Sequence, residues 1–242
     1  MTAELYEKLT KIRRDIHQHP EVSEREFNTT EFLKNHLSNL GIRIVETGLK
    51  TGFIAEIGQG EPIIALRADI DALPIREANT FDYASKNGAM HACGHDFHQT
   101  SLLGAAELLK AKEAELKGTI RLIFQPAEEV GTGADAVIEA GGIEGVSAII
   151  GYHNNPHLKP GQIACVLKQL WLRLKNLRLR TCVSGHAARP DFGIDTILTI
   201  TTIVNNLQAI ISRTVSPFDA AVLSVTHIDA GTTWNVLPSQ AI

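Results

Sequence analysis

Apolar positions recur with two different periods along the first two thirds of the chain. Spacings of three and four residues predict helices over 3–18 and 27–40, and Gly41 is a stop signal after the second. Short apolar runs predict strands at 52–57, 62–68, 119–124 and 148–152, and further helices are expected at 96–110 and 133–140. This alternation of strands with helices predicts an α/β fold, with a sheet that carries helices on its faces.

The pattern changes near Pro160, which predicts a second, smaller domain. Leucines alternate with arginine and lysine over 170–183, as in a strand, and a helix is expected over 193–212. Further strands are expected at 220–228 and from Trp234 onward. One long helix on a sheet makes a small α+β domain, so the predicted domains are 1–166 and 167–242. The last strand has no following partner before Ile242, so we expect the chain to end inside this domain and to aggregate through the open sheet edge.

Composition and charge narrow the class of protein. The chain has 242 residues, of which 44% are hydrophobic and 21% charged, an ordinary globular composition. Its net charge of −4 offers no basic surface for a nucleic-acid partner. Three scattered cysteines favour a reducing compartment, and no apolar run approaches the ~20 residues of a membrane helix. We therefore expect a cytoplasmic, soluble protein with neither a nucleic-acid nor a membrane partner.

Possible metal ligands lie at the ends of successive predicted strands and loops. Cys93 and His95 flank one glycine where the helix at 96–110 begins. Glu128 and Glu129 follow the strand at 119–124, and His153 follows the strand at 148–152. Sulfur, nitrogen and oxygen donors at neighbouring strand ends suggest a metal-centred hydrolase site. Each also has a plainer explanation: a small buried side chain for the cysteine, an acidic surface loop for the glutamates and a structural role for the histidine.

The carboxylates suggest a division of roles. Glu128 and Glu129 repel each other at a buried sheet edge unless a cation or a proton relieves them. One would then bind metal, and the other would take a proton from the attacking water. Asp69 and Asp71 follow the strand at 62–68, and alternation puts both on the same face. Carboxylates in such places often orient metal-binding histidines. An ordinary hydrogen-bonding role is an equal alternative for both aspartates.

Several motifs together resemble those of the dinuclear-metal aminoacylase/carboxypeptidase family. The resemblance is to the branch that contains hippurate hydrolases, indole-acetyl-amino-acid hydrolases and N-acetyl-diaminopimelate deacetylases, and it covers nearly the whole chain. The matching segments are RDIHQHPE at 14–21, RADIDALP at 67–74, HACGHDFH at 91–98, QPAEE at 125–129, GHAARP at 185–190 and AGTTWNVLP at 230–238.

This resemblance implies an architecture and a reaction. It implies a zinc-peptidase-like domain, built on a mixed sheet with helices on both faces, and an α+β lid domain that mediates homodimerisation. It implies hydrolysis of small N-acyl amino acids of the acetyl or benzoyl type, or of short peptides, with two divalent ions, which could be zinc, manganese, cobalt or nickel. By the same resemblance the metal ligands are Cys93 (shared by both ions), His95, Glu129 and His153.

The remaining site residues are carried over in the same way. Glu128 becomes the general base, and His186 stabilises the oxyanion, commonly from the partner subunit. Asn235 is a weaker candidate for substrate contact. The family's chain continues considerably further and adds a final histidine ligand. Residues 168–182 depart from the family pattern, and a pair of compensating frameshifts is one hypothesis for that segment.

Three functional hypotheses follow. The first is an active N-acyl-amino-acid amidohydrolase. The second is an inactive truncated remnant of such an enzyme that keeps only partial metal binding or dimerisation. The third makes Cys93 a thiol nucleophile with His95 as its base, but neighbours in one tight turn point poorly at each other and the two glutamates would be unexplained.

Overall fold

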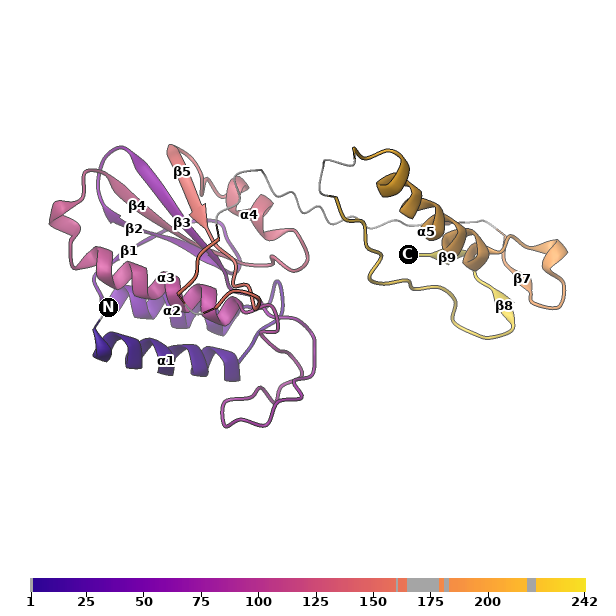
Figure 1. Cartoon of the computed structure of the whole chain (residues 1–242), viewed down its shortest axis with the longest axis horizontal. Coiled ribbons are helices and arrows are strands. Elements are labelled where there is room, and N and C mark those ends of the chain that lie inside the picture. The colour runs from indigo at the N-terminus through magenta and orange to yellow at the C-terminus, as the bar shows by residue number, and fades with distance from the viewer. Residues whose placement is uncertain (1, 160, 165–178, 181–182, 217–220) are drawn as a thin grey trace. The chain divides into compact units, whose positions relative to one another are not determined.

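The computed structural model describes residues 2–159, 161–164, 179–180, 183–216 and 221–242 (Figure 1). The chain divides into two compact units, Met1–Leu170 and Trp171–Ile242. Most of the segment 168–182, for which a frameshift is a hypothesis, lies outside the described residues. In the part of the chain that the structure describes, no helix is long and apolar enough to cross a membrane.

The first unit is built on a five-stranded mixed sheet. The strand order is β1-β2-β4-β3-β5. Strands β1, β2 and β4 pair antiparallel, whereas β3 runs parallel to both β4 and β5. The short strand β1 has no counterpart among the predicted elements, since three residues carry too little periodicity to be recognised. The strands are β1 (Arg43–Val45), β2 (Phe53–Gly58), β3 (Ile63–Asp69), β4 (Thr119–Gln125) and β5 (Val146–Gly151).

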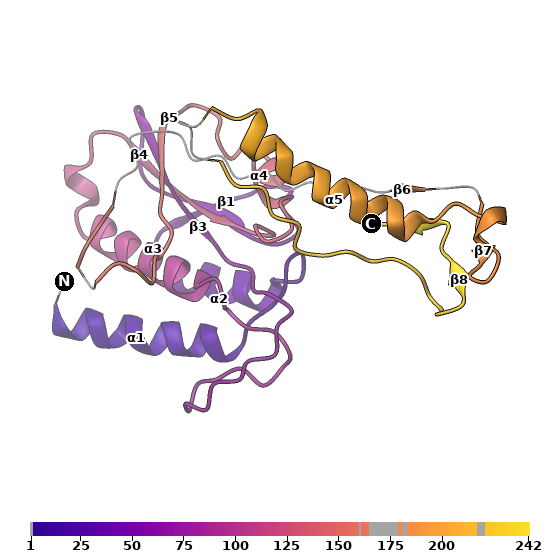
Figure 2. The ribbon, with the colours of Figure 1, turned by 45° about the vertical axis from the view of Figure 1, so that its right-hand side comes forward.

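Helices cover both faces of this sheet, as Figures 1 and 2 show. The helices are α1 (Ala3–Gln18), α2 (Phe27–Asn39), α3 (His95–Lys110) and α4 (Gly133–Glu139), with a short 3-10 helix at Glu113–Glu115. Leu122 and Phe124 of β4 join the main core with residues of α1, α2 and α3. Ile123 between them points to the other face, where it packs with Val137 of α4. The predicted mixed α/β sheet with helices on both faces is therefore confirmed.

The second unit is small and mostly exposed. Among its described residues, one long helix, α5, spans Thr196–Arg213, and two strand pairs, β6 with β9 and β7 with β8, run antiparallel. Helix α5 begins three residues later than predicted because the carboxylate of Asp195 caps it, accepting from the Leu198 N–H at 2.8 Å. The remaining elements are β6 (Leu179–Arg180), β7 (Gly185–His186), a 3-10 helix at Pro190–Phe192, β8 (Val236–Leu237) and β9 (Gln240–Ala241).

One predicted strand of this unit is wrong. Residues 221–228, the described part of the expected strand at 220–228, form no ladder with the other described residues. Val222 is 90% exposed there, so its apolar side chain has no face to pack against. Apolar alternation makes a segment compatible with a strand, but only a neighbouring strand can satisfy its backbone N–H and C=O groups.

Candidate metal centre

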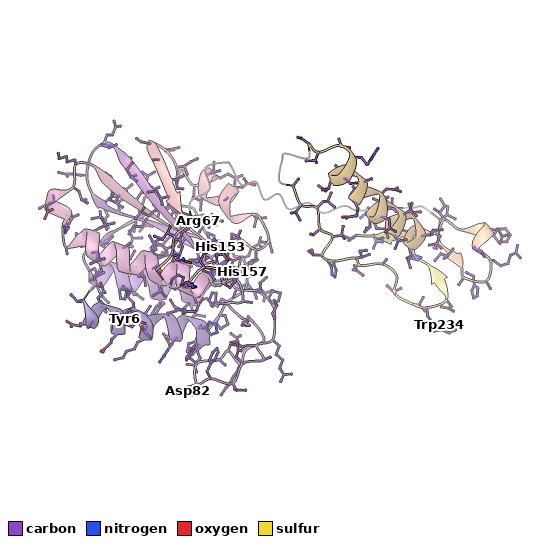
Figure 3. The ribbon with its side chains drawn as sticks, viewed as in Figure 1. Tyr6, Arg67, Asp82, His153, His157 and Trp234 are labelled. Atoms are coloured by element: carbon purple, nitrogen blue, oxygen red, sulfur yellow. The ribbon has the colours of Figure 1, made fainter. Side chains whose placement is uncertain are left out.

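Parallel strands bring the candidate residues of the first unit to one edge of its sheet. Because β4 and β5 both run parallel to β3, their carboxyl ends meet at the same edge. Asp69 and Asp71 leave β3 there, the two glutamates follow β4, and His153 follows β5. Figure 3 labels His153 and Arg67 at this edge.

A glycine turn places Cys93 and His95 at the start of α3. Gly94 has a φ of +91°, a conformation that side-chain-bearing residues rarely adopt. A Cβ atom at this position would lie 2.5 Å from Oδ1 of Asn154. Glycine is therefore required here both by the backbone angle and by the close approach of Asn154.

His95 is the common member of the possible ligand groups. Among the described residues, three sets of side chains have potential ligand atoms within 4.8 Å of one another, and each set contains His95. In one of them, Sγ of Cys93 lies 3.1 Å from Nε2 of His153. The sets are Cys93 with His95 and His153, Asp69 with His95 and His98, and His95 with Glu128 and Glu129.

Asp71 holds the ring of His95 in one orientation. Nδ1 of His95 donates to the backbone oxygen of Asp71 at 2.9 Å and lies 3.1 Å from its Oδ1. Nε2 is left facing the site, buried and without a hydrogen bond to any described residue. Burial opposes a charge on this ring, but the hydrogen bond with Asp71 and the negative charges of Asp69 and Asp71 raise the pKa of His95 to about 11. The site thus attracts positive charge to Nε2.

The glutamate pair lies against the same atom. Oε1 of Glu129 and Oε2 of Glu128 are 3.7 and 3.8 Å from Nε2 of His95. The Glu129 backbone N–H donates to Oδ2 of Asp71 at 3.0 Å. The side-chain Oε1 of Glu129 is buried and has no hydrogen bond among the described residues. Burial raises the pKa of Glu129, and the charges of Glu128 and Asp71 add to this effect. A cation would relieve this repulsion.

These residues fit a divalent metal ion. Two ligand atoms of one tetrahedral zinc ion lie about 3.3–3.5 Å apart, given bond lengths of ~2.0–2.3 Å. The contacts of His95 with the glutamates and of Cys93 with His153, 3.1 to 3.8 Å, bracket this spacing. Nε2 of His95 and Oε1 of Glu129 are buried, have no hydrogen bond to the residues that the structure describes, and lie 3.7 Å apart. The donor set of sulfur, nitrogen and oxygen suits zinc and its neighbours in the first transition series.

Asp69 also lies close to Nε2 of His95, and it supports a second histidine. Its Oδ1 accepts from Nδ1 of His98 at 2.6 Å, and its Oδ2 accepts from Arg67 at 2.7 Å. Burial opposes its charge, but the hydrogen bond from His98 and the charges of His95 and Arg67 lower the pKa of Asp69 to about 2. Asp69 is therefore a fixed negative charge 3.6 Å from Nε2 of His95.

His186 and Asn235 belong to the second unit, where they are close to each other. The Ala187 N–H donates to the backbone oxygen of Asn235 at 3.0 Å, and His186 pairs with Val236 between β7 and β8. The side chain of His186 is exposed, and its Nδ1 accepts from the Ala188 N–H at 3.2 Å.

Three further residues touch this site without having been predicted to do so. His98 lies one helical turn after His95, a spacing that could have suggested its place on the same face. Asn154 follows directly after His153, but no sequence pattern shows that it packs on Gly94. Glu26 is fully buried and accepts from the Ala127 N–H at 2.8 Å. Ala127 directly precedes the glutamate pair and lies 101 residues after Glu26 in the chain.

The fold and the candidate site together define an α/β protein with a place for divalent metal at the carboxyl edge of its sheet. The chain belongs to the peptidase family M20/M25/M40, which it matches over residues 65–239. This confirms the resemblance drawn from the motifs.

Relatives and solved structures agree with this membership. The chain is 49% identical to N-acetyl-L-cysteine deacetylase of Bacillus subtilis (strain 168), over 98% of this chain and 58% of that protein. It is 42% identical to IAA-amino acid hydrolase ILR1-like 5 of Arabidopsis thaliana, over 95% of this chain and 53% of that protein. The crystal structure of the Bacillus subtilis YXEP protein, described as a dinuclear metal binding peptidase, aligns with a TM-score of 0.71 and 44% identity, over 99% of this chain and 63% of that chain. The chain thus spans little more than half the length of these relatives.

Proposed function

We propose that this chain carries the metal centre of an amidohydrolase that cleaves small N-acyl amino acids into a carboxylate and a free amino acid. The observation that carries the proposal is the convergence of Cys93, His153 and the glutamate pair on His95. Support comes from the relatives, which include an N-acetyl-L-cysteine deacetylase and, at 41% identity, an N-acyl-L-amino acid amidohydrolase of Geobacillus stearothermophilus.

The ligands in this proposal are Cys93, His95, Glu129 and His153. Cys93 would be the ligand shared by two ions, and support comes from its place in one group with His95 and His153, with its Sγ 3.1 Å from Nε2 of His153. Asp71 holds His95 so that Nε2 points into the site. When bound, divalent ions would polarise the acyl carbonyl and let a water lose its proton near neutral pH. Their identity among zinc, manganese, cobalt and nickel is part of the experiment below.

Glu128 is the proposed general base. Its carboxylate is partly exposed and lies 3.8 Å from Nε2 of His95, so it can receive a proton at Oε2 from the attacking water. It would then return this proton to the leaving nitrogen. Glu129 is more buried, which suits the role of ligand rather than that of proton carrier.

The second unit is the proposed lid and dimerisation domain, and the first unit the catalytic domain. Within it we propose His186 for the oxyanion and Asn235 for substrate contact; support comes from the GHAARP and AGTTWNVLP motifs and from the adjacency of the two residues across β7 and β8. A homodimer through this domain and a cytoplasmic location complete the proposal.

The test is amino-acid release from N-acetyl and N-benzoyl amino acids with added manganese, zinc or cobalt. We expect turnover by the wild-type chain, and metal binding without turnover by Glu128→Gln. Glu129→Gln should lose metal as well, and Glu139→Gln, an exposed glutamate on α4, should behave as wild type. A wild-type chain that binds metal but is as inert as Glu128→Gln would favour the inactive remnant.

The contact of Cys93 with His153 also resembles a thiol nucleophile beside a base. Activity that survives a chelator but is lost after thiol alkylation would favour that second function.

A further inference from the structure

We propose that Asn154 is a positioning residue which, through His98, holds the loop after β5 in the place where His153 can bind metal. The inference rests on the proposed function, because it concerns the same metal centre. Neither residue is assigned a role by the motifs. The argument comes from three sets of contacts made by the single residue Asn154.

The loop after β5 has few buried apolar side chains to hold it. Strand β5 is at the edge of the described sheet and pairs only with β3. Ile149 and Ile150 on it are 54% and 59% exposed, and Tyr152 after it is 43% exposed. The rings of Tyr152 and His153 contact His98 at 5.2 and 4.7 Å, and polar contacts add to this packing and set the orientation of His153.

The strongest polar contact is made with His98. This ring is fully buried, and the carboxylate of Asp69 at 2.6 Å requires a proton on its Nδ1. Its Nε2 is then an acceptor, and the Asn154 backbone N–H donates to it at 3.0 Å. The Oδ1 position of Asn154 lies 2.6 Å from the same Nε2. Since Nε2 has no proton left to donate, we assign the side-chain amide with its nitrogen in that position.

The other contacts of Asn154 reach the ligands themselves. Its amide covers Gly94, where a Cβ atom would lie 2.5 to 2.8 Å from three atoms of that amide. It thereby packs on the turn between Cys93 and His95. Its backbone oxygen accepts from Nδ1 of His153 at 2.8 Å, which turns Nε2 of that ring toward Cys93 at 3.1 Å. Asn154 thus fixes the position of the loop after β5 relative to the turn before α3.

A matched comparison is available because two asparagines are adjacent. Asn155 is exposed, and its side chain accepts only from the His157 N–H among the described residues. Asn154→Ala should weaken binding of the ion held by His153 by about 10- to 100-fold, the range for removing a partner that orients a ligand. Asn155→Ala should stay within about twofold of wild type.

The measurement is cobalt binding by equilibrium dialysis, with the absorption spectrum recorded at each step. Cobalt reports its ligands, so loss of His153 should change the ligand-field bands while the thiolate band from Cys93 persists. A purely structural role for Asn154 would leave the spectrum of bound cobalt unchanged. In the metal-free chain, hydrogen exchange over 152–159 should be faster in Asn154→Ala than in Asn155→Ala.

The outcomes separate this inference from the proposed function. A wild-type chain that binds no cobalt would overturn both. A wild-type chain that binds cobalt, with Asn154→Ala and Asn155→Ala equal in affinity and spectrum, would overturn the inference alone. Should Asn154→Ala fold poorly, Asn154→Ser keeps a polar side chain but lacks the amide that packs on Gly94, and it must still show weaker cobalt binding with altered bands.

Discussion

Replacing His17 should destabilise the first unit far more than replacing its near neighbour His19. Nδ1 of His17 lies 3.0 Å from Oδ2 of Asp96, and Nε2 lies 3.1 Å from Oε1 of Glu77. Both partners are carboxylates, so only a doubly protonated ring can donate to both. The hydrogen bond with Asp96 outweighs burial and, together with Glu77, raises the pKa of His17.

The expected cost follows from these contacts. The side chain of Asp96 is 1% exposed, and without His17 it keeps only the Nε of Arg13 at 3.0 Å. A hydrogen bond to a charged group contributes about 1.5–3 kcal/mol, and breaking a buried ion pair costs about 3–5 kcal/mol. Because Arg13 remains, we expect His17→Ala to cost about 3 kcal/mol.

His19→Ala is the matched control. His19 lies two residues further along the chain, its side chain is 69% exposed, and its partner Asp15 is 55% exposed. Exposed pairs contribute about 0–1 kcal/mol, so this variant should remain near wild type.

The assay is urea unfolding of the metal-free chains, followed by far-ultraviolet circular dichroism at several pH values. A raised histidine pKa gives stability that is fully present below the ordinary value of 6.5 and is lost as pH rises through the raised value. The gap between wild type and His17→Ala should therefore be widest near about pH 6 and shrink in alkali. Equal midpoints for the two histidine variants, or a gap that grows with pH, would refute this account of the network.

Three further predictions follow from glycine geometry, core packing and a buried acid. Gly94→Ala should weaken cobalt binding at least about tenfold, because the added Cβ atom pushes Asn154 away. The control Gly88→Ala, at φ +90° with open space around it, should bind cobalt as wild type does. Equal cobalt binding by the two variants in dialysis would contradict the steric argument. Phe124→Ala should cost about 3–5 kcal/mol in urea unfolding, since its ring is fully buried and stacks on Phe53 at 4.7 Å. Burial raises the pKa of Glu26, so wild-type stability should fall as pH rises from 4.5 through that raised value. Glu26→Gln should flatten that slope; an unchanged slope would show that another group causes it.

Much of the first unit could be predicted from local pattern. Helix α1 begins where Thr2 caps it by accepting from the Leu5 N–H at 3.2 Å, and it runs over the predicted residues 3–18. The strands β2, β3, β4 and β5 fall within about two residues of their expected bounds, because each is a short apolar run between turn residues. The ligand candidates were predictable for a related reason: chemically distinctive residues stand at strand ends.

Pairing and long-range contact were not predictable in this way. The sequence of 221–228 alternates as a strand should, yet no described strand pairs with it. The parallel pairing of β3 with β4 and β5, which brings the candidate ligands to one edge, is a property of the assembled sheet.

The sequence by itself determined the types of element in the first unit and the set of donor atoms, because periodicity, capping and side-chain chemistry are local properties. Only the tertiary structure decided that Asp71 orients His95, that Asp69 places a negative charge near Nε2 of that ring, and that Asn154 packs on Gly94. The physical reason is that these contacts join residues 24 to 60 positions apart, and their energies depend on distances of a few ångströms that no local pattern encodes.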